Sequence, residues 1–245
     1  MPRARLVMAA NSTAREAAGS RTRKKADKPD GRKTRASREE TLVESVRRLI
    51  LEDIIQVKIR PGTMLQLTEL AEHYGVSRTP VREALSLLER QGLVTAIAYK
   101  GYLVKGIEPS DVHDVYMVRK VIEGAATELA AGRLTPEQLH NLGDSRPPQQ
   151  EHMTLAYDEY AHDFHRGIVE ASHSPRLLAI FEDAYNDVRR MQYAGIGSPR
   201  PDLIQAEHAA IVDALTAKDA KAARALMESH IDAVQMRALQ SWLNS

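Results

Sequence analysis

The sequence of 245 residues contains no cysteine. This absence excludes disulfide bonds and thiolate metal sites, and it fits a protein that works in a reducing compartment. No apolar run approaches the roughly 18 residues that a membrane span requires. The stretch LVMAA near the start is too short for the core of a signal peptide. We therefore expect a cytoplasmic protein that does not enter the membrane.

The chain also lacks a strong overall charge, because its net charge is only +1 at pH 7. Any binding of nucleic acid must then depend on where the charge lies. The first forty residues hold about a dozen lysines and arginines and almost no large apolar side chain, a composition typical of disorder. We expect residues 1–38 to be a disordered basic tail. It is either a solvated segment, including one from a wrongly assigned start, or an arm that contacts DNA phosphates.

Helical periodicity begins near residue 40 and indicates a compact unit over residues 39–106. The segment ETLVESVRRLILEDIIQVKI places Leu42, Val46, Leu49, Ile50 and Ile54 on one stripe. The segment LTELAEHYGVSRTPVREALSLLERQG follows. It predicts a short helix capped by Thr68 that runs to Tyr74, a turn at Gly75, and a longer helix capped by Ser77. A short helix, a glycine turn and a longer helix form the helix-turn-helix pattern, although a plain helical hairpin would show similar apolar spacing.

The next segment, LVTAIAYKGYLVKG, predicts two short strands that meet at Lys100 and Gly101 and form a wing. The first turn of the second helix would enter the major groove of DNA, with Ser77, Arg78, Thr79 and Arg82 toward it. Two arginines four residues apart at the positive end of a helix repel each other, which indicates an external anion. The alternative is an exposed charged face in which Arg82 pairs with Glu83 or Glu89.

These segments resemble a known family. PGTMLQLTELAEHYGVSRTPVREALSLLERQGLV followed by KGYLV is similar to the winged helix-turn-helix of the GntR family of bacterial regulators. Three later segments, VYMVRKVIEGAATELAAGRLT, FHRGIVEAS and AEHAAIVDALTAKDAKAARALMESHI, resemble the FCD effector domain of its FadR-like subfamily. The resemblance implies a homodimeric transcription factor, usually a repressor, that a small metabolite releases from double-stranded operator DNA. It also implies an effector-binding and dimerisation domain over residues 107–245.

The second half independently predicts a helical bundle, because no strand pattern appears in it. Ser110 can cap a first helix, and Thr135-Pro136-Glu137-Gln138 is a capping box. Asp219 can cap the last helix. Further helices are expected at 153–172, 176–194, 201–217 and 219–243. The fold class is therefore mainly α: a winged helix-turn-helix followed by an all-α bundle.

Three histidines lie on or beside apolar stripes of three predicted helices: His165, His208 and His230. A single histidine of this kind is more often a hydrogen-bonded core residue. Three of them indicate a common centre, and imidazoles with an open position suit zinc or nickel. In the resembled family this set holds a divalent metal ion together with an aspartate, but Ala161 occupies that position here. Asp158 or His162 could substitute for it, or the site could have three histidines and bind weakly or not at all.

Arg119 lies on the stripe of Val115, Ile122 and Ala126, so its charge points inward. It either pairs with Glu123 within the helix or binds a carboxylate, as the family's effector contact implies. The sequence thus predicts a metabolite-responsive repressor that is not an enzyme. The alternatives are a metal-dependent hydrolase that uses the three histidines and a DNA binder without sequence preference.

Overall fold

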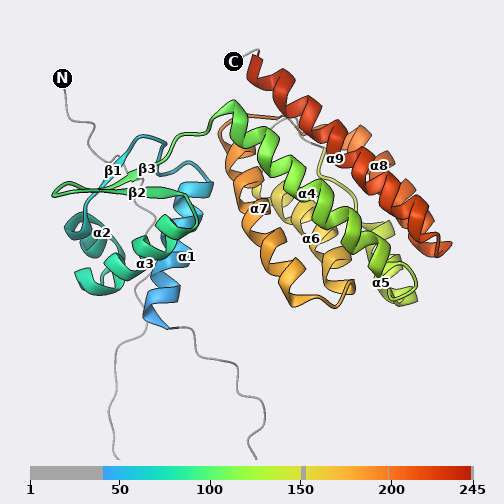
Figure 1. The fold of residues 1–245 in the computed structure, drawn as a ribbon, viewed down its shortest axis with the longest axis horizontal. Coiled ribbons are helices and arrows are strands. Elements are labelled where there is room, and N and C mark those ends of the chain that lie inside the picture. The colour runs from blue at the N-terminus through green and yellow to red at the C-terminus, as the bar shows by residue number, and fades with distance from the viewer. Residues whose placement is uncertain (1–40, 150–152, 198, 244–245) are drawn as a thin grey trace, which may run out of the picture.

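The computed structural model describes residues 41–149, 153–197 and 199–243, and the predicted basic tail at 1–38 lies outside this range. The described chain forms a winged unit followed by a helical bundle, which stand side by side in Figure 1. The predicted fold class, mainly α with an N-terminal winged helix-turn-helix, is confirmed. None of the described helices has the length and apolar character needed to cross a membrane.

The winged unit combines helices with a small sheet. Its helices are α1 (Leu42–Ile55), α2 (Leu67–Tyr74) and α3 (Arg78–Arg90), and its strands are β1 (Met64–Leu65), β2 (Val94–Ile97) and β3 (Gly101–Val104). Their order along the chain is α1-β1-α2-α3-β2-β3. The strands form an antiparallel sheet in the order β1-β3-β2. The sequence predicted the β2–β3 hairpin but not β1, because two residues are too short to show an alternating pattern.

Helix α1 supplies much of the core of the winged unit. Its buried face contains Val46, Ile50, Leu51, Ile54 and Ile55. The predicted stripe was wrong in part: Leu42 and Leu49 are 57% and 43% exposed. The elements packed against α1 cover the side of the helix that carries Val46, Ile50 and Ile54 and the adjacent Leu51 and Ile55. Leu42 and Leu49 lie outside this buried face.

The turn between α2 and α3 follows from one glycine. Gly75 adopts a left-handed conformation with φ 67°, where a residue without Cβ is unstrained, and it ends α2. Ser77 then occupies the predicted N-cap position of α3, although its side chain makes no capping hydrogen bond, and Pro80 is buried within the first turn. The predicted cap at Thr68 was wrong, since Thr68 lies inside α2, which begins at Leu67 with Gln66 as its N-cap residue.

The second unit is an all-helical bundle. It contains α4 (Pro109–Ala130), α5 (Pro136–Asp144), α6 (Leu155–Ala171), α7 (Pro175–Tyr193), α8 (Pro201–Thr216) and α9 (Ala220–Leu243). Helix α4 packs against α6, α7 and α9, and α9 also packs against α8 (Figure 1). Its apolar side chains form cores separate from the core of the winged unit.

Local capping sets several helix boundaries of the bundle. Thr135 and Gln138 form the predicted reciprocal capping box. Asp219 accepts a hydrogen bond of 3.0 Å from the backbone N–H of Ala222, as expected of a cap. Ser110, by contrast, lies inside α4, because a capping box of Glu108 and Asp111 starts that helix at Pro109.

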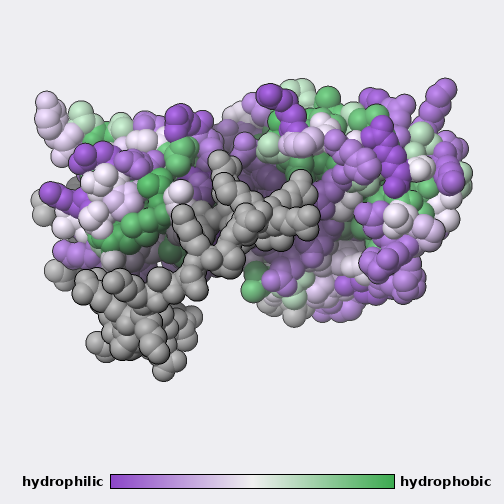
Figure 2. Space-filling view, turned by 90° about the horizontal axis from the view of Figure 1, so that it is seen from below, coloured by the Kyte–Doolittle hydropathy of each residue, from purple (hydrophilic) through white to green (hydrophobic). Residues whose placement is uncertain are grey.

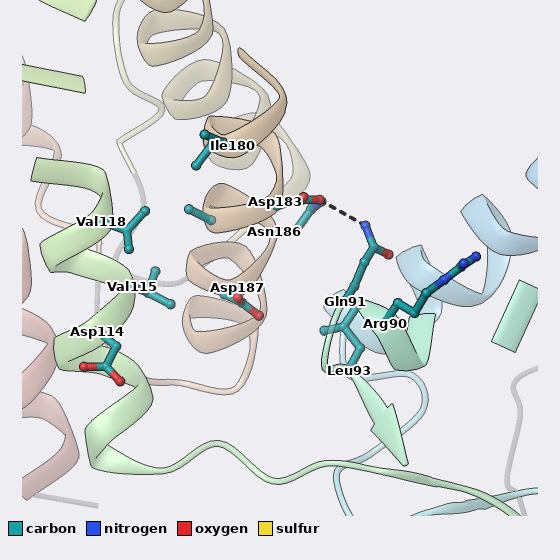
Figure 3. A pocket seen from close by; sticks show the side chains of 11 residues that line it. Arg90, Gln91, Leu93, Asp114, Val115, Val118, Ile180, Asp183, Asn186 and Asp187 are labelled. Atoms are coloured by element: carbon teal, nitrogen blue, oxygen red, sulfur yellow. Dashed lines mark hydrogen bonds between the residues drawn. The ribbon is translucent and has the colours of Figure 1, made fainter. Parts of the chain in front are cut away.

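The two units meet along α7 and the start of α4. A cavity of about 380 Å³ lies between them, and its lining includes Leu93, Asp114, Val118, Ile180 and Asp187 (Figure 3). Across it, the side-chain amide of Gln91 donates a 3.0 Å hydrogen bond to Asp183 of α7. Seen from below, the surface of both units is mainly hydrophilic, with hydrophobic patches on each (Figure 2).

Candidate DNA-binding surface and candidate metal centre

Helix α3 has one buried and one exposed face. Val81, Ala84, Leu85 and Leu88 are buried in the core of the winged unit. The predicted DNA-contacting residues Ser77, Arg78, Thr79 and Arg82 are all exposed on the other side. The apolar residues therefore fix the helix, and the polar residues remain available to a partner.

The arginines of this face have no partner within the described residues, because neither Arg78 nor Arg82 has a carboxylate within ion-pair distance. Glu89, one of the predicted alternative partners of Arg82, instead accepts a 2.8 Å hydrogen bond from the backbone N–H of Ala96 in β2. The mutual repulsion of the two arginines is thus uncompensated in the described chain. The anionic DNA backbone would relieve it, and the acceptor atoms of a guanine edge could bind the same guanidinium groups.

The tip of the wing combines an exposed lysine with a structurally required glycine. Lys100 is exposed at the tip, as predicted. Gly101 has φ 115°, and a Cβ there would lie 2.2 Å from the carbonyl oxygen of Leu65. Gly101 is therefore explained by the close approach of β1 to β3. Tyr99 is fully exposed at the same tip, and the sequence analysis missed it although an aromatic residue beside Lys-Gly in a hairpin turn was visible.

The structure brings the three predicted histidines together from three helices. His165 of α6, His208 of α8 and His230 of α9 are buried, and each offers a ligand atom within 4.8 Å of the others. The Nε2 atoms of His165 and His230 lie 3.3 Å apart. The rings of His208 and His230 have centroids 4.9 Å apart. This separation of ligand atoms fits a single metal ion bound between them.

Each ring has a further polar group beside its Nδ1 atom: the contacts of His208 and His230 are hydrogen bonds, and that of His165 is a close approach without hydrogen-bond geometry. Nδ1 of His165 lies 2.6 Å from Glu123, and Nδ1 of His230 lies 2.6 Å from Glu207. Nδ1 of His208 is 2.9 Å from the hydroxyl of Tyr160. The Nε2 atoms are therefore the ones left for the centre, and that of His208 is buried without a partner. Outer groups that fix the ring and its tautomer are typical of histidine metal ligands.

The electrostatics keep the rings neutral, as metal ligands must be. Burial, with smaller contributions from nearby cations, lowers the pKa of His165 to about 4. Burial also lowers the pKa of His208 and that of His230. Burial opposes ionisation of Glu123, yet the charge of the neighbouring Arg119, with a smaller contribution from the contact with His165, lowers its pKa to about 2. At neutral pH the site thus presents uncharged imidazoles next to an ionised carboxylate.

Neither suggested substitute for the family aspartate joins the histidines. Both carboxylate oxygens of Asp158 contact Arg189, whose Nε is 2.8 Å from each, so Asp158 belongs to a different cluster. His162 is turned toward Glu182, with Nε2 at 2.9 Å from that carboxylate. Ala161 has no ligand atom. Among the described residues the centre therefore consists of three histidines.

Arg119 lies next to this centre and forms the intrahelical pair that the sequence left open. Its Nε donates a 2.6 Å hydrogen bond to Glu123, and the pair is almost completely buried. Its guanidinium carbon lies 5.2 Å from the ring centre of Tyr185. One nitrogen, Nη2, is buried without a partner, so the guanidinium retains unused hydrogen-bonding capacity.

The sequence named Glu123 as a possible partner of Arg119, but it did not predict that Glu123 and Glu207 each contact a histidine of the centre. Glu123 joins Arg119 to His165, and Glu207 joins His230 to Arg237. The available signals were weak: Glu123 follows Arg119 by four residues, and Glu207 directly precedes His208. Neither spacing shows that the carboxylate will face a histidine of another helix.

Comparison with known proteins decides the family. The model of bacterial regulatory proteins of the gntR family matches residues 42–104, and the FCD domain model matches residues 114–233. An uncharacterized HTH-type transcriptional regulator in an unstable DNA locus of Streptomyces ambofaciens is 30% identical over 185 residues, which cover 74% of this chain and 78% of that protein. The chain belongs to the GntR family of bacterial regulators. Its second unit is an FCD domain.

A second regulator and a solved structure are also similar to this chain. The HTH-type transcriptional repressor RspR of Escherichia coli (strain K12) is 27% identical over 197 residues, which cover 78% of this chain and 86% of that protein. The solved structure of E. coli McbR/YncC has a TM-score of 0.66 at 20% identity and covers 82% of this chain and 99% of that one, which shows a shared fold. These GntR relatives are transcriptional regulators, so the chain is a DNA-binding regulator and not an enzyme.

Proposed function

We propose that this GntR-family chain is a dimeric, sequence-specific repressor in the cytoplasm that a small organic acid releases from operator DNA. We assign DNA binding to residues 39–106 and effector binding and dimerisation to residues 107–245. The separate apolar cores of the two units support this division. The proposed DNA contacts are the exposed Ser77, Arg78, Thr79 and Arg82 at the start of α3, and the exposed Lys100 with the partly buried Gly101 at the wing.

One observation carries the proposal for the effector: Arg119 Nη2 is buried without a partner close to a three-histidine centre. A buried guanidinium nitrogen without an acceptor is costly, and a carboxylate oxygen would satisfy it. The histidines would hold a divalent metal ion, zinc or nickel, through three nitrogens. When bound, such an ion supplies a Lewis-acidic position that a carboxylate can occupy. Arg119 would orient that carboxylate, while Glu123, Glu207 and Tyr160 keep the rings in place.

The proposal of a dimer has support in the surface of the FCD domain. Met117, Val118 and Val121 of α4 are 51%, 37% and 61% exposed, and they lie within one turn of one another. Ile180 of α7, 42% exposed, lines the same cavity as Val118 (Figure 3). A second copy would bury this apolar group, and a pair of winged units suits an operator with two half-sites. Sedimentation of the pure protein as a monomer at micromolar concentration would contradict this step.

The substitution Arg119→Lys tests the effector proposal. A lysine keeps a positive charge opposite the buried Glu123, whereas an alanine would leave that carboxylate uncompensated and destabilise the fold. We expect Arg119→Lys to bind operator DNA as the wild type does but to respond poorly to effector. A lysine ammonium cannot replace the planar guanidinium, which binds a carboxylate through two nitrogens. The measurement is operator release by a panel of small carboxylic acids.

Two outcomes would contradict the proposal. Wild-type release of Arg119→Lys at an unchanged acid concentration would remove Arg119 from the effector site. Equal affinity of the wild-type protein for its own promoter and for random DNA at physiological salt would indicate a DNA binder without sequence preference.

A further inference from the structure

Arg189 of α7 lies between two carboxylates that belong to different units. Its Nε is 2.8 Å from both oxygens of Asp158 on α6, and its Nη2 is 2.7 Å from Asp158 Oδ2. On its other side, Nη2 lies 2.9 Å and Nη1 lies 3.3 Å from the carboxylate of Glu52 on α1. Within the described part of the chain, this is the only ion pair that joins the winged unit to the FCD domain.

Both carboxylates are held in place on their own side. Asp158 is almost completely buried and also accepts a 3.3 Å hydrogen bond from the hydroxyl of Tyr193. Glu52 accepts a 2.6 Å hydrogen bond from Gln56, one turn later on α1. Because the planar guanidinium binds each carboxylate through two nitrogens, it fixes direction as well as distance. The Glu52–Arg189–Asp158 triad therefore constrains the angle between α1 and α7.

Besides the packing of Tyr193 against the core of the winged unit, the other polar contacts along α7 are single hydrogen bonds. Gln91 reaches Asp183 through one hydrogen bond between exposed side chains, and Arg190 donates one to the backbone carbonyl of Lys105. The cavity beside Gln91 shows that the two units are not packed closely there (Figure 3). A single hydrogen bond limits the distance between two groups but does not fix their relative orientation. The triad is the one contact of the interface with bidentate geometry among the described residues.

Two members of the triad lie on helices beside the histidine centre: Asp158 on α6, which carries His165, and Arg189 on α7. Asp158 precedes His165 by seven residues on α6, which is two turns on the same face. Arg189 follows Tyr185 by four residues on α7, and the Tyr185 ring lies 5.2 Å from the Arg119 guanidinium and 6.1 Å from the His165 ring. A shift of α6 against α7 at the histidines would thus displace Arg189, which binds Glu52, and Asp158, which holds Arg189.

We propose that Arg189 is a positioning residue that, with Asp158 and Glu52, forms an ionic latch setting the orientation of the winged unit against the FCD domain. The latch acts through orientation and touches neither DNA nor effector. Its function in operator binding rests on the proposed repressor function above, whereas its effect on orientation does not.

The substitution Glu52→Gln tests the latch because it removes one charge and leaves the buried Arg189–Asp158 pair in place. The chain has no cysteine, so spin labels can be attached at Glu72→Cys and Arg176→Cys, two exposed positions in the two units. The labelled protein is diluted with unlabelled protein so that the measured distances arise within one chain. We expect a narrow distance distribution in the wild type and a clearly broader one in Glu52→Gln.

Arg166→Ala is the matched control. Like Arg189, Arg166 pairs with two carboxylates, Glu170 and Glu182. Arg166 lies on α6, and all three residues belong to the FCD domain. We expect it to leave the distribution narrow. A distribution for Glu52→Gln as narrow as that of the wild type would overturn the latch, as would equal broadening by Arg166→Ala.

A DNA measurement separates orientation from general damage. A flexible pair of winged units must be fixed to meet two half-sites, whereas one half-site needs only one unit. Glu52→Gln should therefore bind the full operator about two- to fivefold more weakly, the range expected for a partly exposed ion pair, and bind an isolated half-site as the wild type does. An equal loss on both DNAs, or tighter operator binding, would overturn the positioning role. If the wild type itself showed no preference for the full operator, the proposed dimeric repressor would fail, and the distance measurement would still decide the latch.

Discussion

At the scale of single residues, the two arginines of α3 carry the clearest functional signal. Arg78 and Arg82 are exposed, lack partners among the described residues and lie at the positive end of a helix whose other face is buried. Their position follows directly from Gly75 and Ser77, which end one helix and begin the next. Local sequence was sufficient here because each arginine is placed by the helix that it belongs to.

Arg82→Ala tests base recognition by this face. We expect a loss of about 1–3 kcal/mol in binding free energy at the specific operator and a much smaller loss on random DNA, because a bidentate contact to a base edge is specific to sequence. Arg90→Ala, at the other end of the same helix, is the control and should change neither affinity. Titration of both DNAs measures the effect, and an equal loss on both for Arg82→Ala would make Arg82 a phosphate contact.

His208→Ala tests the metal centre. It removes one of three ligands, so zinc or nickel loaded into the wild type should no longer be retained, and a chelator should cease to lower the melting temperature. A ligand bound only by the folded state stabilises it by about 2.7 kcal/mol when present at a hundred times its Kd. His162→Ala is the control, since His162 faces Glu182. If elemental analysis finds no zinc or nickel in the wild-type protein after loading, the metal centre is contradicted and the histidines have a structural role only.

At the scale of elements, the wing depends on a contact that its own sequence does not show. The strand β1 is two residues long and pairs with β3 through Met64 and Leu65. Its approach leaves no room for a side chain at Gly101. The hairpin is encoded locally by its turn and its alternating residues, whereas the third strand is recruited from a distant part of the chain.

Gly101→Ala should therefore destabilise the winged unit by about 2–4 kcal/mol, the sum of a strained left-handed backbone and a clash with Leu65. Gly92→Ala separates the two causes, because Gly92 has φ 79° but nothing within 4 Å of the added Cβ. That control should cost about 1 kcal/mol from strain alone. Urea unfolding gives both values, and equal losses would show that β1 moves aside without cost.

At the scale of the whole molecule, the interface between the units places a carboxylate where water is scarce. Asp187 of α7 lines the cavity between them, and burial raises its pKa to about 6. Between its unfolded pKa near 4 and this value, the folded state binds more protons than the unfolded state. The free energy of unfolding should then fall as the pH rises from about 4 to about 6 and level off above that value.

Asp187→Asn should remove this pH dependence. Relative to wild type, we expect the variant to gain about 1–2 kcal/mol of stability between pH 4 and pH 8, because it no longer ionises in the cavity. Asp213→Asn, at an exposed position on α8, is the control and should show no comparable gain. Thermal unfolding across this pH range gives the comparison, and parallel stability curves for Asp187→Asn and wild type would contradict the prediction.

The sequence by itself determined the local features of this protein: the glycine turn, the exposed arginines of α3, the β2–β3 hairpin and the helical bundle. It also predicted that three histidines converge, because each lay on or beside the apolar stripe of its own helix. These features depend on periodicity and capping, which act over a few residues.

Only the tertiary structure decided which polar groups face one another. It placed Asp158 against Arg189 rather than near the histidines, paired Arg119 with Glu123, and brought Glu207 to His230. The direction of a side chain at the edge of a helix stripe depends on the crossing of neighbouring helices and on the partners they supply. That geometry is set by packing between segments far apart in the chain, so no local pattern encodes it.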